Sequence, residues 1–139
     1  MPLVRITVRD DTSPDLQQAI SAGVHRAMMA TIGIPEGDRF QIIDRRPADS
    51  LIADPEYLGV ARQNVVFVEI MLVSGRTVEK KKALYAAVAK ELGAAGVRTE
   101  DVFVVLRESE RENWSLGNGE AQVLDTELLK RYGWTPPTA

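Results

Sequence analysis

The chain opens with the sequence MPLVRITV (residues 1–8), and this stretch predicts the first strand of the fold. Val4, Ile6 and Val8 alternate with a more polar set of side chains, so one face of the strand is apolar. A proline directly follows the initiator methionine. Initiator methionines are readily removed before a small residue, and the mature chain would then begin with the amine of Pro2.

A free amine at this point is a candidate catalytic base. A free α-amino group titrates at about 7.7–8, close to the pH at which general acids and bases work best. No other obvious base competes with it, because the chain has no cysteine and a single histidine, His25. His25 falls on the polar side of its predicted helix, so we expect it at the surface. A chance proline, or retention of Met1, is the alternative to a catalytic Pro2.

An internal repeat organises the chain beyond this strand. Ser13 and Thr77 are each followed by a pattern typical of an amphipathic helix, and glycines such as Gly33 end these helices. The predicted strands lie at residues 3–8, 39–43, 65–73 and 102–106. The helices match at an offset of 64 residues, in the pairs Ser13/Thr77, Ala19/Ala83, Ile20/Leu84, Ala22/Ala86 and Val24/Val88.

This repeat predicts an α+β fold with two tandem β-α-β units. We expect one domain over residues 1–139, with units at residues 2–44 and 65–108 and a C-terminal extension at residues 109–139. Right-handed crossovers would place both helices on one face of a four-stranded sheet, and oligomerisation would cover the other face. A pseudo-two-fold between the units makes the first and third strands antiparallel. Arg76, just after the third strand, would then lie close to Pro2.

The remaining segments carry weaker signals. Residues 45–63 have no sustained period and are expected to form a long connection. A short helix is expected at residues 124–131, and residues 132–139 are expected to be a frayed tail. Tyr85 and Phe103 are assigned to the core.

Composition excludes several functional classes. The 139 residues are 45% hydrophobic and 27% charged, as is usual for a globular protein. The net charge of −3 argues against a nucleic-acid partner, which requires a basic patch. One histidine and no cysteine leave no multi-histidine or thiolate metal site. No apolar run has the length of a membrane span, so we expect a cytoplasmic protein without a membrane partner.

Four segments together resemble the tautomerase superfamily, and in particular the group around malonate semialdehyde decarboxylase. They are spread over residues 2–130 and fairly specific as an ordered set. In chain order they are Met1-Pro2-Leu3, Gly33-Ile34-Pro35 with Asp38-Arg39-Phe40-Gln41, Ser74-Gly75-Arg76-Thr77, and Asn113-Trp114-Ser115-Leu116-Gly117-Asn118-Gly119.

The resemblance implies a cofactor-free homotrimer with an amino-terminal proline as acid or base. The proline maps to Pro2, the accompanying aspartate to Asp38, and the carboxylate-binding arginine to Arg76. Trp114 and Leu116 map to the apolar wall of the substrate pocket. The expected substrate is a small carboxylate.

The turn before the second helix departs from the decarboxylase pattern. The decarboxylase carries two arginines there, separated by one residue, whereas the present chain has Arg76 alone, next to Gly75. We therefore expect keto–enol tautomerisation of a 2-oxo acid, with decarboxylase or hydratase activity on a 3-oxo acid such as malonate semialdehyde as a further possibility. The alternative is a non-catalytic trimer that keeps the fold for ligand binding or assembly.

Overall fold

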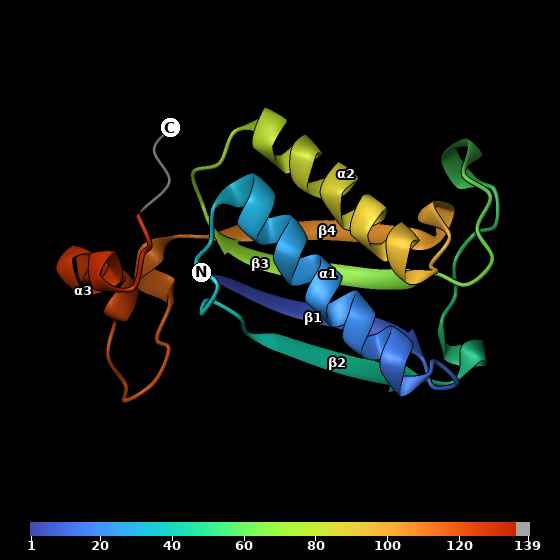
Figure 1. The fold of residues 1–139 in the computed structure, drawn as a ribbon, viewed down its shortest axis with the longest axis horizontal. Helices are drawn as coiled ribbons and strands as arrows, with labels where there is room; N and C mark the ends of the chain where they lie inside the picture. The colour runs from blue at the N-terminus through green and yellow to red at the C-terminus, as the bar shows by residue number, and fades with distance from the viewer. Residues whose placement is uncertain (136–139) are drawn as a thin grey trace.

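A computed structural model describes residues 1–135 as one mixed sheet with two long helices and a C-terminal segment (Figure 1). The strands are β1 (Pro2–Arg9), β2 (Gln41–Arg46), β3 (Val66–Val73) and β4 (Val102–Ser109). The helices are α1 (Pro14–Ile32), α2 (Val78–Ala95) and α3 (Thr126–Arg131). Short 3₁₀ turns lie at Ala48–Ser50, Tyr57–Gly59, Thr99–Asp101, Arg111–Asn113 and Gln122–Leu124.

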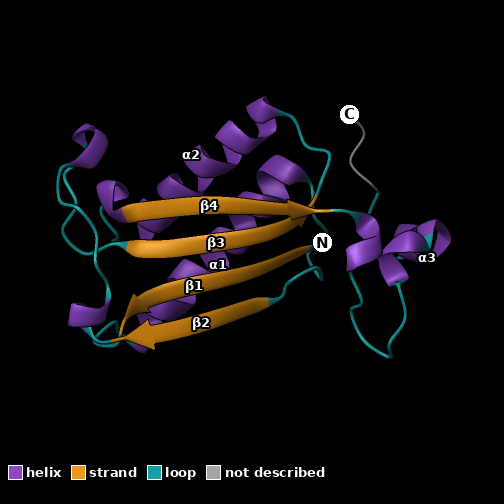
Figure 2. Cartoon of the chain, turned by 180° about the vertical axis from the view of Figure 1, so that it is seen from behind, coloured by secondary structure: helices purple, strands orange, loops and turns teal. Residues whose placement is uncertain are grey.

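The strand order is β2-β1-β3-β4. Each unit contributes a parallel pair, β1 with β2 and β3 with β4, and the two units meet through antiparallel β1 and β3. Both α1 and α2 cover the same face of the sheet (Figures 1 and 2). The predicted pair of β-α-β units, its antiparallel junction and the one-sided helices are therefore confirmed.

The helix ends follow from the capping residues. Ser13 Oγ accepts a hydrogen bond from the Leu16 amide at 3.1 Å, and Thr77 Oγ1 accepts one from the Lys80 amide at 3.2 Å. Gly33 ends α1 in a left-handed conformation with φ of 67°, which glycine adopts without a steric penalty.

The core lies between the helices and one face of the sheet. Alternate residues of β1 and β3 point into it, and Val4, Ile6 and Val68 are fully buried. The opposite face of the sheet carries exposed apolar side chains such as Ile42 and Phe103.

The predictions were wrong for two core residues and for the bounds of two strands. Tyr85 and Phe103 are 39% and 45% exposed. Phe103 lies in a continuous hydrophobic run, which hides the alternation that turns it to the open side of β4. Tyr85 comes one position after Leu84 of the buried Leu84–Val88–Leu92 stripe, and this rotation about the helix axis turns it outward. In addition, β2 runs over Gln41–Arg46 and not over residues 39–43, and β4 extends beyond residue 106 to Ser109.

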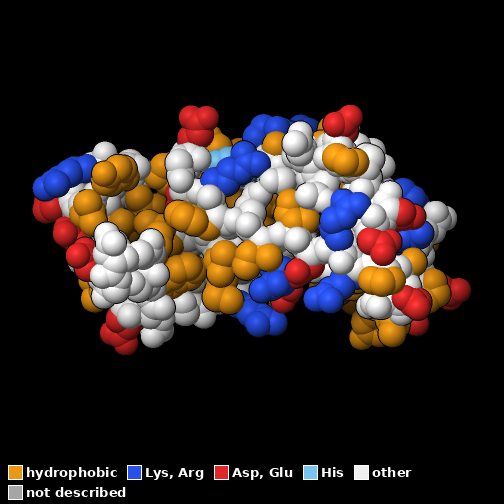
Figure 3. All heavy atoms as spheres, turned by 90° about the horizontal axis from the view of Figure 1, so that it is seen from below, with side chains coloured by type: hydrophobic (Ala, Val, Ile, Leu, Met, Phe, Trp, Pro, Cys, Tyr) orange, Lys and Arg blue, Asp and Glu red, His pale blue; other side chains and the backbone are white. Residues whose placement is uncertain are grey.

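The C-terminal segment packs instead of fraying. Leu129 and Trp134 are 3% and 2% exposed and form a second apolar cluster with Val73 and Val123. The predicted frayed tail is therefore wrong for residues 132–135, and its last four residues lie outside the described part of the chain. Figure 3 shows hydrophobic side chains gathered at the end of the molecule that carries α3.

Within residues 1–135, no helix combines the length and the apolar character needed to cross a membrane.

Candidate active site

The start of β1 lies beside the C-terminal segment, at the end of the sheet where β3 finishes (Figure 1). Pro2 pairs with Leu72, the penultimate residue of β3. The nitrogen of Met1, which precedes Pro2 in this structure, lies 3.2 Å from Asp38 Oδ2. The sheet register therefore brings the chain start, the end of β3 and the turn that carries Asp38 to one place.

Asp38 is a buried carboxylate on the turn that leads into β2. Its residue is 7% exposed, and its amide donates to the Pro35 carbonyl at 3.0 Å. The charge contact with Met1 is not a well-aligned hydrogen bond, and neither Asp38 oxygen has a hydrogen-bond partner within residues 1–135. A buried carboxylate with free acceptors is costly unless a ligand or water satisfies it.

His25 supports this turn from α1, and its predicted surface position was wrong. It is 4% exposed, and its Nε2 lies 2.8 Å from the Glu36 carbonyl oxygen. Because a carbonyl only accepts, Nε2 carries the proton, which leaves Nδ1 without a partner in the described chain. The loop after Gly33 folds back against α1. It buries His25, which the helical pattern places on the polar face of the helix.

Arg76 lies three residues after the end of β3 and two residues before α2. Its Nη1 donates to the Val73 carbonyl at 2.8 Å. Burial lowers the pKa of Arg76, while the carboxylates of Glu108 and Asp38 act in the opposite direction. A guanidinium remains charged under these conditions, so Arg76 contributes a partly buried positive charge to this end of the sheet.

The amine at the chain start is weakly basic in this environment. Burial lowers the pKa of the Met1 amine from its ordinary value of 8.0. The negative charge of Asp38 opposes this shift, and the positive charge of Arg76 adds to it. An amine in these surroundings is neutral over a wider pH range than a solvated one.

A hollow of about 210 Å³ lies beside the amine. Its lining comes from two parts of the chain. The first is Met1 with the stretch that holds Pro35, Gly37, Asp38 and Phe40, and the second is the C-terminal segment, with Leu116, Leu129, Tyr132 and Trp134. Trp114 is not among the lining residues. It packs against the second apolar cluster, and its Nε1–H donates to Ser109 Oγ at 2.9 Å.

Sequence reasoning missed Phe40, Leu129 and Trp134 as part of this wall. The residue type was a signal for Trp134, because tryptophan side chains are largely buried on average in folded proteins. Nothing in the spacing of Phe40 or Leu129 marks them as pocket residues.

The sequence pattern of the tautomerase enzyme family matches residues 2–61, and a second tautomerase pattern matches residues 38–117. The chain belongs to the tautomerase family. The probable tautomerase YusQ of Bacillus subtilis (strain 168) is 39% identical and aligns over its whole length with 90% of this tautomerase. The probable tautomerase YrdN of the same organism is 28% identical over 92% of the chain.

Solved structures agree with this membership. The FG41 malonate semialdehyde decarboxylase inhibited by 3-bromopropiolate is 36% identical, with a TM-score of 0.86 over 90% of this chain and 96% of its own. A fused 4-OT described as a symmetric trimer is 27% identical, with a TM-score of 0.74 over 88% of this chain and 98% of its own. The present chain is therefore an enzyme of the tautomerase or decarboxylase-like type.

Proposed function

We propose that this tautomerase interconverts the enol and keto forms of a small 2-oxo acid, with the amine of Pro2 as the proton carrier. The neutral amine takes the proton of the enol hydroxyl. The C–O bond becomes C=O as the C=C electron pair takes a proton from the resulting ammonium at the adjacent carbon. One proton is removed and one returned, so the amine is regenerated.

The observation that carries the proposal is the buried amine 3.2 Å from a buried carboxylate. Removal of Met1 would transfer the chain start to Pro2, one residue further into β1. The same surroundings would then act on a secondary amine and lower its pKa toward neutrality, where a general base is most efficient.

Arg76 is the proposed carboxylate-binding residue. Its charge acts on both the amine and Asp38, and a guanidinium offers a carboxylate two parallel hydrogen bonds. Asp38 is proposed to set the protonation state of the amine. Leu116, in the wall of the hollow, and Trp114, packed behind it, are proposed to form the apolar side of the substrate site.

Decarboxylation of a 3-oxo acid such as malonate semialdehyde is the second candidate reaction. The likeness to the FG41 malonate semialdehyde decarboxylase favours it. The single arginine at residues 74–77 favours tautomerisation, because a departing carboxylate has to be both bound and oriented. In that reaction carbon dioxide would leave, and the ammonium would protonate the remaining carbon. Hydration of a 2-oxo or 3-oxo acid is the further variant.

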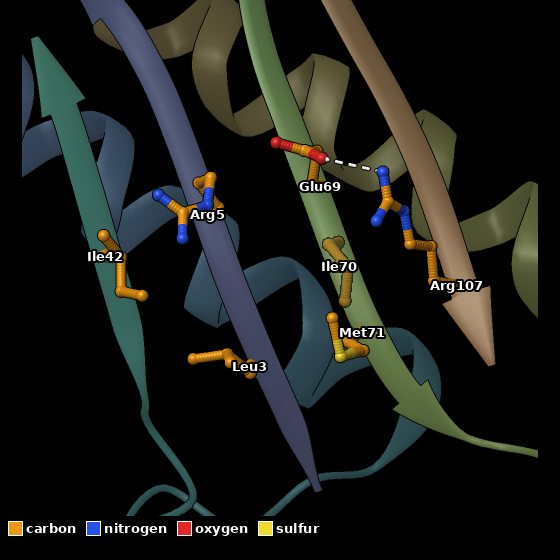
Figure 4. Close-up of a pocket in the computed structure, with 7 residues that line it drawn as sticks. All are labelled: Leu3, Arg5, Ile42, Glu69, Ile70, Met71 and Arg107. Atoms are coloured by element: carbon orange, nitrogen blue, oxygen red, sulfur yellow. Dashed lines mark hydrogen bonds and ion pairs between the residues drawn. The ribbon is translucent and has the colours of Figure 1, made fainter. Parts of the chain in front are cut away.

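A homotrimer is the proposed assembly. The sheet face opposite α1 and α2 carries four half-exposed apolar side chains, Ile42, Met71, Phe103 and Val105, which together we term the open face. Figure 4 shows Leu3, Ile42 and Met71 around a hollow of about 170 Å³ on this face, with Glu69 and Arg107 paired at its edge. Apolar surface of this kind is typical of subunit interfaces, and the fused 4-OT relative is a trimer.

The test combines mass and turnover. An intact mass lower than the translated chain by one methionine residue is expected, together with measurable ketonisation of phenylenolpyruvate. Pro2→Ala and Arg76→Ala are each expected to lower kcat/KM about 100-fold or more, in the range that general acid–base groups contribute. Lys80→Ala, an exposed change four residues beyond Arg76, is the matched control and should leave kcat/KM unchanged.

A retained methionine with no turnover would contradict the proposal and support the alternative, a non-catalytic trimer that binds a ligand or serves assembly. Equal kcat/KM for the wild type and for both variants would also contradict it. A parallel assay with malonate semialdehyde separates the two candidate reactions.

A further inference from the structure

Glu108, at the end of β4, is a second carboxylate whose charge acts on Arg76. In the sheet register Pro2 pairs with Leu72, and Leu72 pairs with Glu108. Strands β3 and β4 both end on the side of the sheet where β1 begins (Figure 2). Because neighbouring strands lie about 4.8 Å apart, Glu108 stands in the same row of the sheet as Pro2, with about 10 Å between the two Cα atoms.

The side chain of Glu108 lies on the helix side of the sheet and is held by α2. Paired residues of neighbouring strands point to the same face, and Leu72 is fully buried beneath the helices. From α2, Lys81 Nζ donates to Glu108 Oε1 at 2.5 Å. The side chains of Lys81 and Glu108 are 24% and 29% exposed, so the ion pair is partly shielded from solvent.

Arg76 has no carboxylate partner within residues 1–135. None of the ion pairs of this part of the chain includes it, and its one hydrogen bond goes to the Val73 carbonyl. Burial lowers the pKa of Arg76, and the charge of Glu108 opposes this shift more strongly than that of Asp38. The guanidinium therefore has donors left for a ligand, although a carboxylate of the protein itself is close by.

Glu108 and a substrate carboxylate are competitors for the same guanidinium. A glutamate side chain has rotatable bonds, and a carboxylate gains free energy when it pairs with a partly buried cation. The ion pair with Lys81 offsets this gain by giving Glu108 another partner. Without Lys81, the attraction between Glu108 and Arg76 would be unopposed.

From this arrangement we infer that Lys81 is a positioning residue, which holds Glu108 against α2 and thereby keeps Arg76 free for the substrate carboxylate. Lys81 does not line the hollow beside the amine, so it acts through Glu108. The inference rests on the proposed function for the role of Arg76. It deepens that function by assigning part of the substrate affinity to an ion pair between α2 and β4.

Binding of an unreactive monocarboxylate, 3-phenylpropanoate, tests this role without any proton transfer. In Lys81→Met, Glu108 should occupy Arg76 in most molecules. Isothermal titration of the full chain should then give a Kd about fivefold higher, because only the fraction with a free guanidinium binds. Lys81→Arg retains the cation and should bind like the wild type. Lys82→Met is the matched control, because it removes the same charge from an exposed neighbour on α2, and it should leave the Kd unchanged.

A double variant distinguishes competition from a general effect of charge. With Glu108→Gln present no carboxylate competes, so Lys81→Met should no longer raise the Kd. A through-space effect of the lysine charge would instead raise the Kd by the same factor in both backgrounds. Equal factors in the two backgrounds, or an unchanged Kd in Lys81→Met alone, would overturn the inference.

Turnover of phenylenolpyruvate gives a second readout. In Lys81→Met, KM should rise by the same factor as the Kd while kcat stays unchanged, whereas a merely structural role would lower kcat and spare neither variant of the pair. A fall in kcat with an unchanged KM would therefore overturn the inference.

Arg76→Ala separates the inference from the proposed function. It should weaken the binding of 3-phenylpropanoate and make Lys81→Met silent. Binding that is unchanged in Arg76→Ala would reject Arg76 as the carboxylate-binding residue of the proposed function. Binding that is weakened in Arg76→Ala, together with equal effects of Lys81→Met in both backgrounds, would reject the role of Lys81 alone.

Discussion

At the scale of single residues, the pairing of Asp38 with the amine gives a pH-dependent prediction. The base is active when neutral, so kcat/KM should rise with pH through the pKa of the Pro2 amine. Burial lowers the pKa of the Met1 amine from 8.0 in this structure, and the same burial is expected to act on Pro2 once Met1 is removed. Asp38 raises that pKa. Asp38→Asn should therefore lower it, and the acid limb of the pH–rate profile should move to lower pH.

Asp101→Asn is the control for this profile, because Asp101 occupies the repeat position of Asp38. It is 3% exposed, but its Oδ1 accepts a hydrogen bond from the Gln63 amide at 2.7 Å, far from the chain start. The acid limb should stay in place in this variant. A limb that moves to higher pH in Asp38→Asn, or does not move, would contradict the assigned role of Asp38.

At the scale of elements, the contact between α1 and the Asp38 turn is open to a direct test. His25→Leu removes the part-buried hydrogen bond to the Glu36 carbonyl, and the loss of one hydrogen bond typically costs about 0.5–1.5 kcal/mol. The free energy of unfolding should fall by that amount, and kcat/KM should fall because the turn loses its support. His25→Gln retains a donor and should recover part of both. Thermal or urea unfolding, followed by turnover, measures the effect.

A positioning role for His25 predicts more than lost stability. The acid limb of the pH–rate profile should shift in His25→Leu in the same direction as in Asp38→Asn, because a loosened turn weakens the pairing of Asp38 with the amine. An unchanged profile, with lost stability alone, would leave His25 as an ordinary core residue.

The sequence predicted elements well where local chemistry decides them. Local chemistry decides the caps at Ser13 and Thr77 and the alternation in β1. The repeat predicted that the two units meet through antiparallel β1 and β3. His25, Phe103 and Trp134 were misplaced because contacts remote in sequence decide their burial. The turn over α1 covers His25, the open face exposes Phe103, and the return of the chain past β3 buries Trp134. For the candidate site, the family resemblance implied that Asp38 accompanies the chain start, while most of the apolar wall was not predicted.

At the scale of the whole molecule, the open face gives a prediction about assembly. Val105 is 37% exposed at the centre of β4, and Val105→Arg would bury a charge in the proposed interface. Sedimentation should give a trimer for the wild type and smaller species for this variant. Val78→Lys changes an apolar residue that is 59% exposed on α2, away from the open face, and should remain trimeric. A monomeric wild type would contradict the assembly.

The two units of the fold differ in what stands before their first strand. In the second unit the chain runs without a break through Gln63 into β3, and Asp101 is occupied by that backbone. In the first unit the corresponding carboxylate, Asp38, lies 3.2 Å from the Met1 nitrogen at the start of the chain. A peptide tag fused ahead of Met1 would make the first unit resemble the second and silence it.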